Sequence, residues 1–179
     1  NSVEAGIGFL PEDRKSEGLI QQQPIKNNIL QASMKRYFKR GLVDKKAEKE
    51  LAERYRGELK IATPDVTRRV SALSGGNQQK VVIAKWLCTE NRILIFDEPT
   101  RGIDVGAIEF IWNEIVKQVE QKRVSVLLIT YDLNEAMTLS DRILVMFEGS
   151  VQKELTGPDY DEKEIGFYML GGNADETTA

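Results

Sequence analysis

The fold of this chain is decided by Leu73-Ser74-Gly75-Gly76-Asn77-Gln78-Gln79-Lys80 and, one predicted helix later, by Ile93-Leu94-Ile95-Phe96-Asp97-Glu98-Pro99-Thr100. In the first stretch, a serine and two glycines stand directly before a helical pattern. Their backbone N–H groups and the helix dipole can face an anion, because glycine has no Cβ to obstruct the approach. This stretch therefore predicts a phosphate site.

The second stretch predicts a metal and base site. Four apolar residues form a short buried strand, and Asp97 and Glu98 follow at its carboxyl end, where open α/β sheets bind their ligands. Mg²⁺ prefers oxygen ligands and keeps several waters, so Asp97 can hold it beside phosphates while Glu98 serves as a base. Pro99 disfavours the helical region for the preceding residue, so Glu98 is expected on an extended backbone.

Composition points to one soluble globular domain. The 179 residues are 41% hydrophobic and 30% charged, which suffices for a sizeable core. A net charge of −3 gives no general affinity for nucleic acid, and no run approaches the roughly 18 apolar residues of a membrane span. The single cysteine, Cys88, cannot form an internal disulfide, which suits a reducing cytoplasm.

Two absences narrow the chemistry further. The chain contains no histidine, which excludes imidazole acid-base catalysis and histidine metal ligands. It also contains no Gly-Lys pair, so no G-x-x-x-x-G-K-[S/T] phosphate loop is present. Since the chain opens on Asn-Ser rather than Met, we expect it to be a fragment of a longer protein whose N-terminal portion is left off.

The flanking patterns predict an α/β fold with a parallel sheet. Residues 6–10 read as a strand ended by Pro11, and residues 24–59 as two or three helices. Residues 104–119 predict a helix with one broad buried face, and 125–130 a second apolar strand, which gives a βαβ unit. Towards the C-terminus we expect a hairpin of residues 142–147 and 151–155, with Gly149 in the turn, and a helix within 161–170.

These motifs resemble a known family. Residues 73–80 read as the signature motif of ABC ATPases, and residues 93–98 resemble their Walker B strand with the catalytic glutamate attached. The residues of the first stretch are similar to the corresponding motif in the ATP-binding subunits of bacterial sugar-uptake ABC transporters of the ribose, galactose and xylose type. Those subunits carry two ATPase domains in tandem, and this chain is most similar to the second, from about Gly6 to Gly149.

The resemblance implies a partial P-loop NTPase core of the ABC ATPase type, with a parallel sheet, a helical subdomain and a C-terminal hairpin. We expect one partial nucleotide-binding domain over 1–179 that lacks the phosphate loop. Within it, residues 1–18 and 91–170 form the α/β core, about 19–90 the helical subdomain, and 171–179 a flexible tail.

The resemblance also implies the residues of the domain's own ATP site. Asp97 would bind Mg²⁺ and Glu98 would act as the catalytic base. Glu12 stands in the Q-loop, where most ABC ATPases have glutamine. Tyr131 stands where most of them have a histidine that contacts the γ-phosphate and orients the attacking water. A tyrosine can donate one hydrogen bond but carries no positive charge, so it cannot do both parts of this work.

Other residues would serve the partner ATPase domain. In the family, the signature motif binds the γ-phosphate of ATP held by the opposite domain, which assigns Ser74, Gly75, Gly76 and Gln78 to that site. Asp104 lies in a stretch similar to the D-loop, through which the two ATPase domains communicate. Ser74 and Asp104 are also suitable N-caps for the helices that follow them.

The function implied is that of an ABC-type ATPase that powers import of a sugar or related small solute, with ATP and Mg²⁺ as cofactors. Its partners would be a second ATPase domain on the same or another chain, transmembrane permease subunits and, indirectly, a periplasmic or extracellular solute-binding protein. Nucleic acid is not expected. The protein would lie on the cytoplasmic face of the cell membrane, and the fragment alone is predicted to be inactive.

Two alternatives stay open. The domain could be a regulatory site that binds nucleotide without hydrolysing it, which Tyr131 and the missing phosphate loop favour and Glu98 opposes. It could also be a non-transport ATPase of the same superfamily, such as a chromosome-maintenance or DNA-repair protein. That class carries a long coiled coil and a basic DNA-facing surface, and neither is visible in the sequence. The transported solute cannot be read from the sequence.

Overall fold

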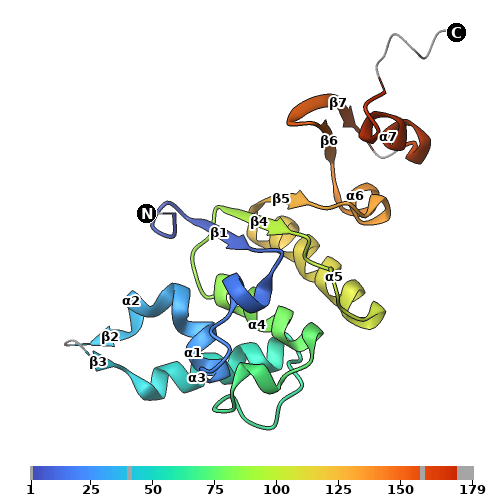
Figure 1. Cartoon of the computed structure of the whole chain (residues 1–179). Helices are drawn as coiled ribbons and strands as arrows, with labels where there is room; N and C mark the ends of the chain where they lie inside the picture. Colours follow the sequence, from blue (N-terminus) through green and yellow to red (C-terminus); the bar gives the residue numbers. More distant parts are fainter. Residues whose placement is uncertain (1, 40–41, 158–159, 173–179) are drawn as a thin grey trace, which may run out of the picture. The chain divides into compact units, whose positions relative to one another are not determined.

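The computed structural model describes residues 2–39, 42–157 and 160–172, drawn in colour in Figure 1. Its contacts divide the chain into two units, Asn1–Ile129 and Thr130–Ala179. The sequence did not predict this boundary. The division into a helical subdomain and an α/β core is a separate expectation, and it stays a prediction.

A three-stranded parallel sheet forms the centre of the first unit (Figure 1). It consists of β1 (Ile7–Leu10), β4 (Ile93–Asp97) and β5 (Ser125–Ile129), with β4 in the middle. Both pairings are parallel, with Phe9 opposite Ile95 and Ile95 opposite Leu127. The predicted α/β class with a parallel sheet is confirmed, and the carboxyl ends of β1, β4 and β5 meet along one edge.

The sheet buries one face only within the described residues. In β4, Leu94 and Phe96 are buried, whereas Ile93 is 40% exposed. In β5, Leu127 and Ile129 are 51% and 45% exposed. The expectation that residues 93–96 form a buried strand therefore holds for one face only, because alternate residues of a strand point to opposite faces and only one of these faces is covered.

Helix α4 (Gly75–Leu87) packs against β1 and carries much of the core. Its Val81, Val82 and Ala84 are completely buried, and Trp86 is half-buried. Full burial of a valine stabilises the fold by about 1.5–3 kcal/mol. The helix predicted between the two motif stretches is confirmed, and it ends with Cys88 as its C-cap.

The segment between β1 and α4 is mostly helical. Its elements are the wide turn η1 (Arg14–Gly18), α1 (Ile25–Leu30), η2 (Gln31–Ser33), α2 (Met34–Tyr37), β2 (Phe38–Lys39), β3 (Leu42–Val43), α3 (Lys45–Glu58) and η3 (Val70–Ala72). Helix α1 packs against both α3 and α4. Leu51 and Tyr55 on α3 and its C-cap Leu59 are buried. The antiparallel pair β2–β3 is not predicted from the sequence, because two residues are too few for a periodic pattern.

Helix α5 (Val105–Lys122) connects β4 to β5, as the predicted βαβ unit requires. Ile111 and Ile115 are buried, but Val116 and Val119 are each 38% exposed. The buried face is therefore narrower than predicted. Part of it is polar, since Gln118 Nε2 donates to Glu114 Oε1 at 2.6 Å and both side chains are buried.

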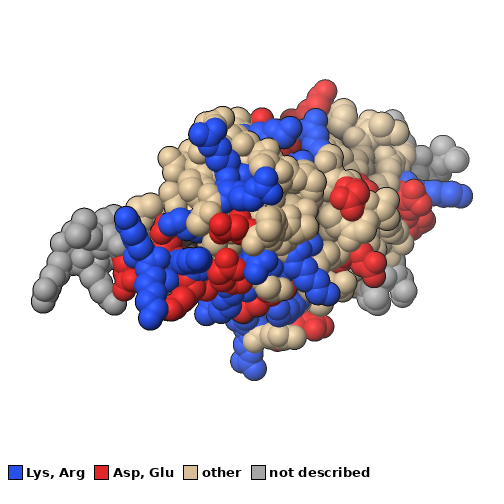
Figure 2. Space-filling model, turned by 90° about the horizontal axis from the view of Figure 1, so that it is seen from below, with Lys and Arg blue, Asp and Glu red and all other residues tan. Residues whose placement is uncertain are grey.

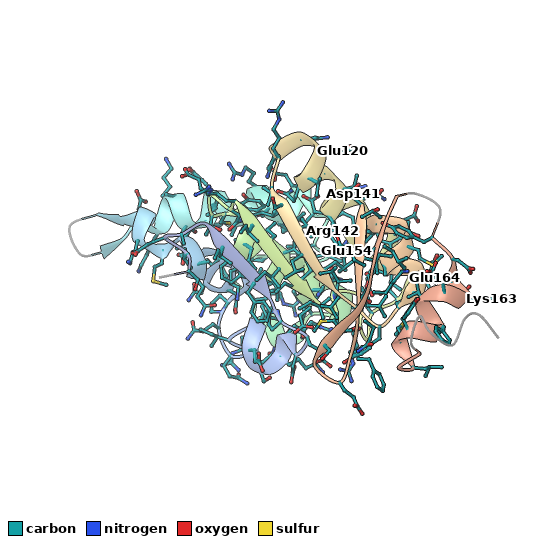
Figure 3. All side chains as sticks on the ribbon, turned by 90° about the horizontal axis from the view of Figure 1, so that it is seen from above. Glu120, Asp141, Arg142, Glu154, Lys163 and Glu164 are labelled. Carbon is teal, nitrogen blue, oxygen red and sulfur yellow. The ribbon has the colours of Figure 1, made fainter. Side chains whose placement is uncertain are left out.

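The second unit contains α6 (Leu133–Leu139), the antiparallel hairpin of β6 (Arg142–Phe147) and β7 (Ser150–Thr156), and α7 (Glu162–Met169). The hairpin turns at Glu148 and Gly149, which have φ of 46° and 79° and so match a tight two-residue turn. Figure 3 labels Arg142 and Glu154, whose side chains pair across the hairpin at 3.4 Å. The predicted hairpin and closing helix are confirmed, while 173–179 of the predicted tail lie outside the described residues.

The core of this unit is formed by Ile143, Val145, Ile165 and Tyr168, from β6 and α7. Among residues 2–39, 42–157 and 160–172, no helix combines the length and the apolarity that a membrane crossing requires.

Candidate phosphate-binding site

The first turn of α4 is open to an anion. Ser74 is its N-cap, with an extended backbone, as predicted. Within the described residues the Ser74 side chain does not cap this turn, and its hydroxyl instead accepts from Asn77 Nδ2 at 2.9 Å. The leading amides of α4 therefore keep the uncapped N–H groups and the positive dipole end that attract phosphate.

An open depression of about 200 Å³ lies at this turn. It is lined by Lys60, Ala62, Ser74, Gly76, Asn77, Lys80, Asp104, Gly106 and Ala107. These residues come from the N-termini of two helices, α4 and α5, and from the loop that precedes the signature motif. Two helix dipoles and two lysines therefore meet at one depression, with a single carboxylate, Asp104, among the lining residues.

Gly76 allows the two helix ends to come this close. A Cβ atom at Gly76 would lie 3.1 Å from Ala107 Cβ and 3.3 Å from Asp104 Oδ2. Asp104 caps α5, because its carboxylate accepts from the Ala107 N–H at 3.0 Å. The prediction that Asp104 caps this helix is confirmed.

Lys80 is held at the rim of the depression. Its Nζ donates to the Lys60 carbonyl at 3.2 Å and lies 4.1 Å from the centre of the Phe110 ring. Burial lowers the pKa of Lys80, the negative charge of Asp104 opposes this shift, and Lys60 adds to it. A bound phosphate would favour the charged form of Lys80.

Gln78 does not reach this depression. Its side chain is 4% exposed, and its Nε2 donates to the carbonyls of Leu73 at 3.2 Å and Val70 at 3.4 Å. Asn77, which the sequence analysis passed over, lines the depression instead. Consecutive helix residues point about 100° apart, so the helical phase after Gly76 could have separated these two positions.

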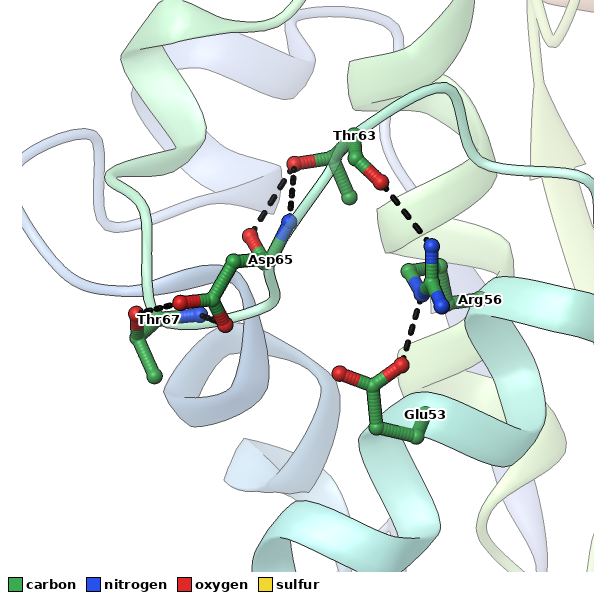
Figure 4. Close-up of polar contacts among 5 residues, drawn as sticks. All are labelled: Glu53, Arg56, Thr63, Asp65 and Thr67. Carbon is green, nitrogen blue, oxygen red and sulfur yellow. Dashed lines mark hydrogen bonds and ion pairs between the residues drawn. The ribbon is translucent and has the colours of Figure 1, made fainter.

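The loop before the signature motif is fixed by side-chain hydrogen bonds (Figure 4). Arg56 bonds to Glu53 at 2.6 Å and to the Thr63 carbonyl at 3.0 Å. Asp65 accepts from the N–H and the hydroxyl of Thr67 at 2.9 and 2.5 Å. The Ala62 N–H then donates to Asn77 Oδ1 at 2.7 Å, which joins this loop to α4 at the depression.

Asp97 and Glu98 lie at the carboxyl end of β4 and are half-buried. Glu98 has a φ of 47°, so the expectation of an extended backbone is wrong. The chain turns here: the Glu98 N–H donates to the Ile129 carbonyl at 2.9 Å, and the Glu98 carbonyl accepts from the Arg101 N–H at 3.1 Å. A non-glycine residue in this region stores about 1–3 kcal/mol of strain.

Two contacts connect this strand end to its surroundings. Gln79 is 1% exposed and its Nε2 donates to the Pro99 carbonyl at 2.7 Å, which joins α4 to the turn after β4. Glu12, predicted in the Q-loop, forms an ion pair with the Arg101 side chain on the same turn. The sequence did not indicate either contact.

Tyr131 belongs to the second unit, where its side chain is 81% exposed. Asp132 follows it and caps α6 by accepting from the Glu135 N–H at 3.1 Å. The role of Tyr131 stays a prediction.

Asp97 could hold a magnesium ion together with nucleotide and water oxygens. Within the described part of the chain, no three His, Cys, Asp or Glu side chains gather as a metal cluster. Because Mg²⁺ is commonly bound by one or two carboxylates plus phosphates and waters, a half-buried carboxylate at a strand end fits this ion.

Comparisons with known proteins agree with this geometry. A family profile described as ABC transporter matches residues 1–101. A xylose import ATP-binding protein from Thermoanaerobacter pseudethanolicus is 44% identical over 172 residues, which cover 96% of this chain and 34% of that protein. A ribose import ATP-binding protein from Hahella chejuensis is 43% identical over 176 residues, covering 98% of this chain and 35% of that protein. The chain thus spans about a third of the length of these relatives.

Solved structures show the same fold. The ATP-binding cassette MJ0796, solved as a dimer in a post-hydrolysis state with ADP and Pi, superposes with a TM-score of 0.72 at 26% identity. The superposition covers 84% of this chain and 62% of that one. The cassette MJ1267 in its ADP conformation gives 0.66 at 22% identity, covering 94% of this chain and 66% of that one.

Proposed function

Because the chain belongs to the ABC transporter family, we propose that it forms part of an ATP-binding subunit that powers import of a sugar or a related small solute. The observation that carries this proposal is the depression at Ser74 and Gly76, where the N-termini of α4 and α5 meet beside two lysines. Such an arrangement favours phosphate groups. The sugar import relatives support the transport role.

The depression would receive the γ-phosphate of ATP held by a partner ATPase domain. The backbone amides of Gly75 and Gly76 would donate to the phosphate. Asn77, rather than Gln78, is the side chain assigned to this site, because Asn77 lines the depression. Asp104 would contact the partner domain from the start of α5. The dimeric state of the related cassette supports a site built from two domains.

The domain's own nucleotide would lie at the carboxyl end of β4. Asp97 would hold Mg²⁺, which when bound neutralises phosphate charge. Glu98 would accept the proton of the attacking water, and Tyr131 would donate a hydrogen bond to the phosphate or to that water. Phosphoryl transfer needs mostly positioning and charge stabilisation, so these groups would act only where a phosphate loop, which this chain lacks, and the partner domain complete the site.

We place the whole protein at the cytoplasmic face of the cell membrane, bound to permease subunits that receive solute from a binding protein. Basic and acidic side chains lie intermixed on the face drawn in Figure 2, and a DNA-facing surface of one sign is not seen there. A regulatory site that does not hydrolyse ATP is the second candidate, because Tyr131 carries no positive charge.

Gly76→Ala in the full-length protein tests the role of the depression. The added methyl would meet Ala107 and Asp104 and narrow the space for a phosphate. We expect ATP turnover at the partner domain's site to fall at least about tenfold, since outright loss of one transition-state donor costs about 10²–10³-fold. Gly57→Ala is the matched control, because nothing lies within 4 Å of its Cβ position. Equal turnover in both variants would refute a nucleotide site here.

A further inference from the structure

Arg14, in the loop after β1, makes polar contacts with residues 87 and 88 positions further along the chain. Its Nη1 donates to the Arg101 carbonyl at 2.9 Å, and its Nη2 donates to the Gly102 carbonyl at 3.2 Å. These two carbonyls are consecutive in the turn after β4, where Gly102 has a φ of 67°. The planar fork of a guanidinium matches two adjacent acceptors, which the single ammonium of a lysine cannot do in the same way.

The same guanidinium lies against the first turn of the signature helix. A Cβ atom at Gly75 would be 2.8 Å from Arg14 Nη2 and 3.3 Å from the Gly102 carbonyl oxygen. Glycine at position 75 therefore leaves the space that the guanidinium occupies. One side chain thus contacts both α4 at its start and the turn that leads into α5.

Arg14 itself is held in place from both ends of η1. Asp13 caps this turn by accepting from the N–H groups of Lys15 at 3.0 Å and Ser16 at 3.3 Å. At the other end, the Gly18 carbonyl accepts from Lys85 Nζ of α4 at 2.7 Å. Burial lowers the pKa of Arg14, and the negative charge of Asp13 opposes this shift. The guanidinium remains charged, as arginine does in proteins generally.

We infer that Arg14 is a positioning residue that holds the turn after β4 and the first turn of α4 in register, and so shapes the depression between α4 and α5. The inference rests on the proposed function insofar as that depression receives a nucleotide. Arg14 does not line the depression, but it contacts the start of α4 and the turn that leads to Asp104, which do line it. Its effect is expected on turnover more than on nucleotide affinity, because misplacement by about 1 Å can cost about 10²-fold in rate.

The first experiment measures amide hydrogen exchange on this chain in wild type, Arg14→Lys, Arg14→Ala and the control Lys15→Ala. The probes are the Arg101 N–H, bonded to the Glu98 carbonyl, and the Gln78 N–H, bonded to the Ser74 carbonyl. We expect exchange at both amides to accelerate about tenfold in the two Arg14 variants at an unchanged melting temperature. Lys15 is an exposed neighbour on η1, so its variant should exchange as wild type. Unchanged exchange in the Arg14 variants would overturn the inference.

The second experiment measures ATP turnover of the full-length protein with the same substitutions. We expect kcat to fall about tenfold or more in Arg14→Lys, with KM within about twofold, and no change in Lys15→Ala. Normal kcat in the presence of accelerated exchange would overturn the positioning role. If wild type itself shows no turnover, the proposed function fails, while accelerated exchange would still support the contact.

Gly75→Ala provides a variant that keeps the arginine. Its methyl would displace the guanidinium, so exchange at Arg101 and Gln78 should accelerate as in Arg14→Ala. In the double variant the methyl meets no guanidinium, and the two effects should be less than additive. If the effects of the two substitutions on exchange were fully additive, the proposed coupling between Arg14 and Gly75 would be contradicted. If Arg14→Ala unfolds, the same comparison is made with Arg14→Lys.

Discussion

Glu98 holds a left-handed backbone conformation at the end of β4. Such strain persists only where surrounding contacts enforce it, here the hydrogen bonds of its N–H to Ile129 and of its carbonyl to Arg101. The sequence predicted the residue and its role, but not this conformation. Pro99 restricts the backbone conformation of Glu98 only through its direct neighbour contacts. The hydrogen bond that holds Glu98 in the left-handed conformation is accepted by Ile129, which is distant in sequence.

Glu98→Gln keeps the size of the side chain and removes its basicity. In the full-length protein, with the other site disabled, we expect ATP binding to persist and turnover to fall by about 10²–10⁴-fold, the range for a lost general base. Titration with ATP and a phosphate-release assay measure the two properties. Glu148→Gln is the matched control, since Glu148 also has a positive φ, of 46°, in the hairpin turn of the second unit. Turnover unchanged by Glu98→Gln would remove the assignment.

Tyr131→His tests the departure from the family pattern. A phenol supplies a hydrogen bond without positive charge, so we expect the wild-type site to hydrolyse ATP more slowly than its tandem partner. Histidine should raise turnover at this site, and Tyr131→Phe should not. A rate that stays level or drops in Tyr131→His would mean that another residue already orients the water.

At the scale of elements, the long periodic segments were predictable and the short connections were not. Helices α4 and α5 and the β6–β7 hairpin follow from apolar spacing and from turn residues such as Gly149. Turn η1 depends on contacts of Asp13 and Arg14, the latter with partners 87 and 88 positions along the chain. No local pattern encodes such contacts. The burial of Gln78 rather than Asn77, by contrast, follows from the helical phase after Gly76.

The contact between α4 and η1 should make stability depend on pH. Lys85 is 6% exposed and donates to the Gly18 carbonyl, and burial lowers the pKa of Lys85 to about 8. The folded state thus loses this proton before the unfolded state does. Relative to Lys85→Met, the free energy of unfolding of wild type should rise as pH increases from about 8 to about 10.5, by on the order of 2 kcal/mol.

Urea unfolding of both proteins at pH 7.5, 8.5 and 9.5 measures this difference. Burial also raises the pKa of Tyr55 and of Cys88, each to about 12, which lowers stability at high pH. Both groups are present in wild type and in Lys85→Met, so their effect cancels in the comparison. A difference between the two proteins that stays constant with pH would show that Lys85 titrates normally.

At the scale of the molecule, the function we propose assigns to this chain parts of two nucleotide sites and the complete phosphate cradle of neither. No Gly-Lys pair occurs in the sequence, so the backbone donors and the lysine of a phosphate loop are missing. Asp97 and Glu98 would serve one nucleotide, and Ser74 and Gly76 another. The parts within the chain follow from the sequence motifs, whereas the completion of each site depends on groups that the chain does not contain.

We therefore predict that this polypeptide by itself binds Mg-ATP weakly or not at all and has no ATPase activity. The start of α4 offers one exposed anion site, and the attraction of a helix terminus for a charge is about 0.3–1 kcal/mol. Micromolar affinity requires about 8 kcal/mol, which this contact and two lysines do not supply. Calorimetric titration of the purified chain with Mg-ATP measures the affinity, with sodium sulfate as the control for simple anion binding. Saturable micromolar binding of Mg-ATP would contradict the prediction, because it would require phosphate donors beyond those at Ser74 and Gly76.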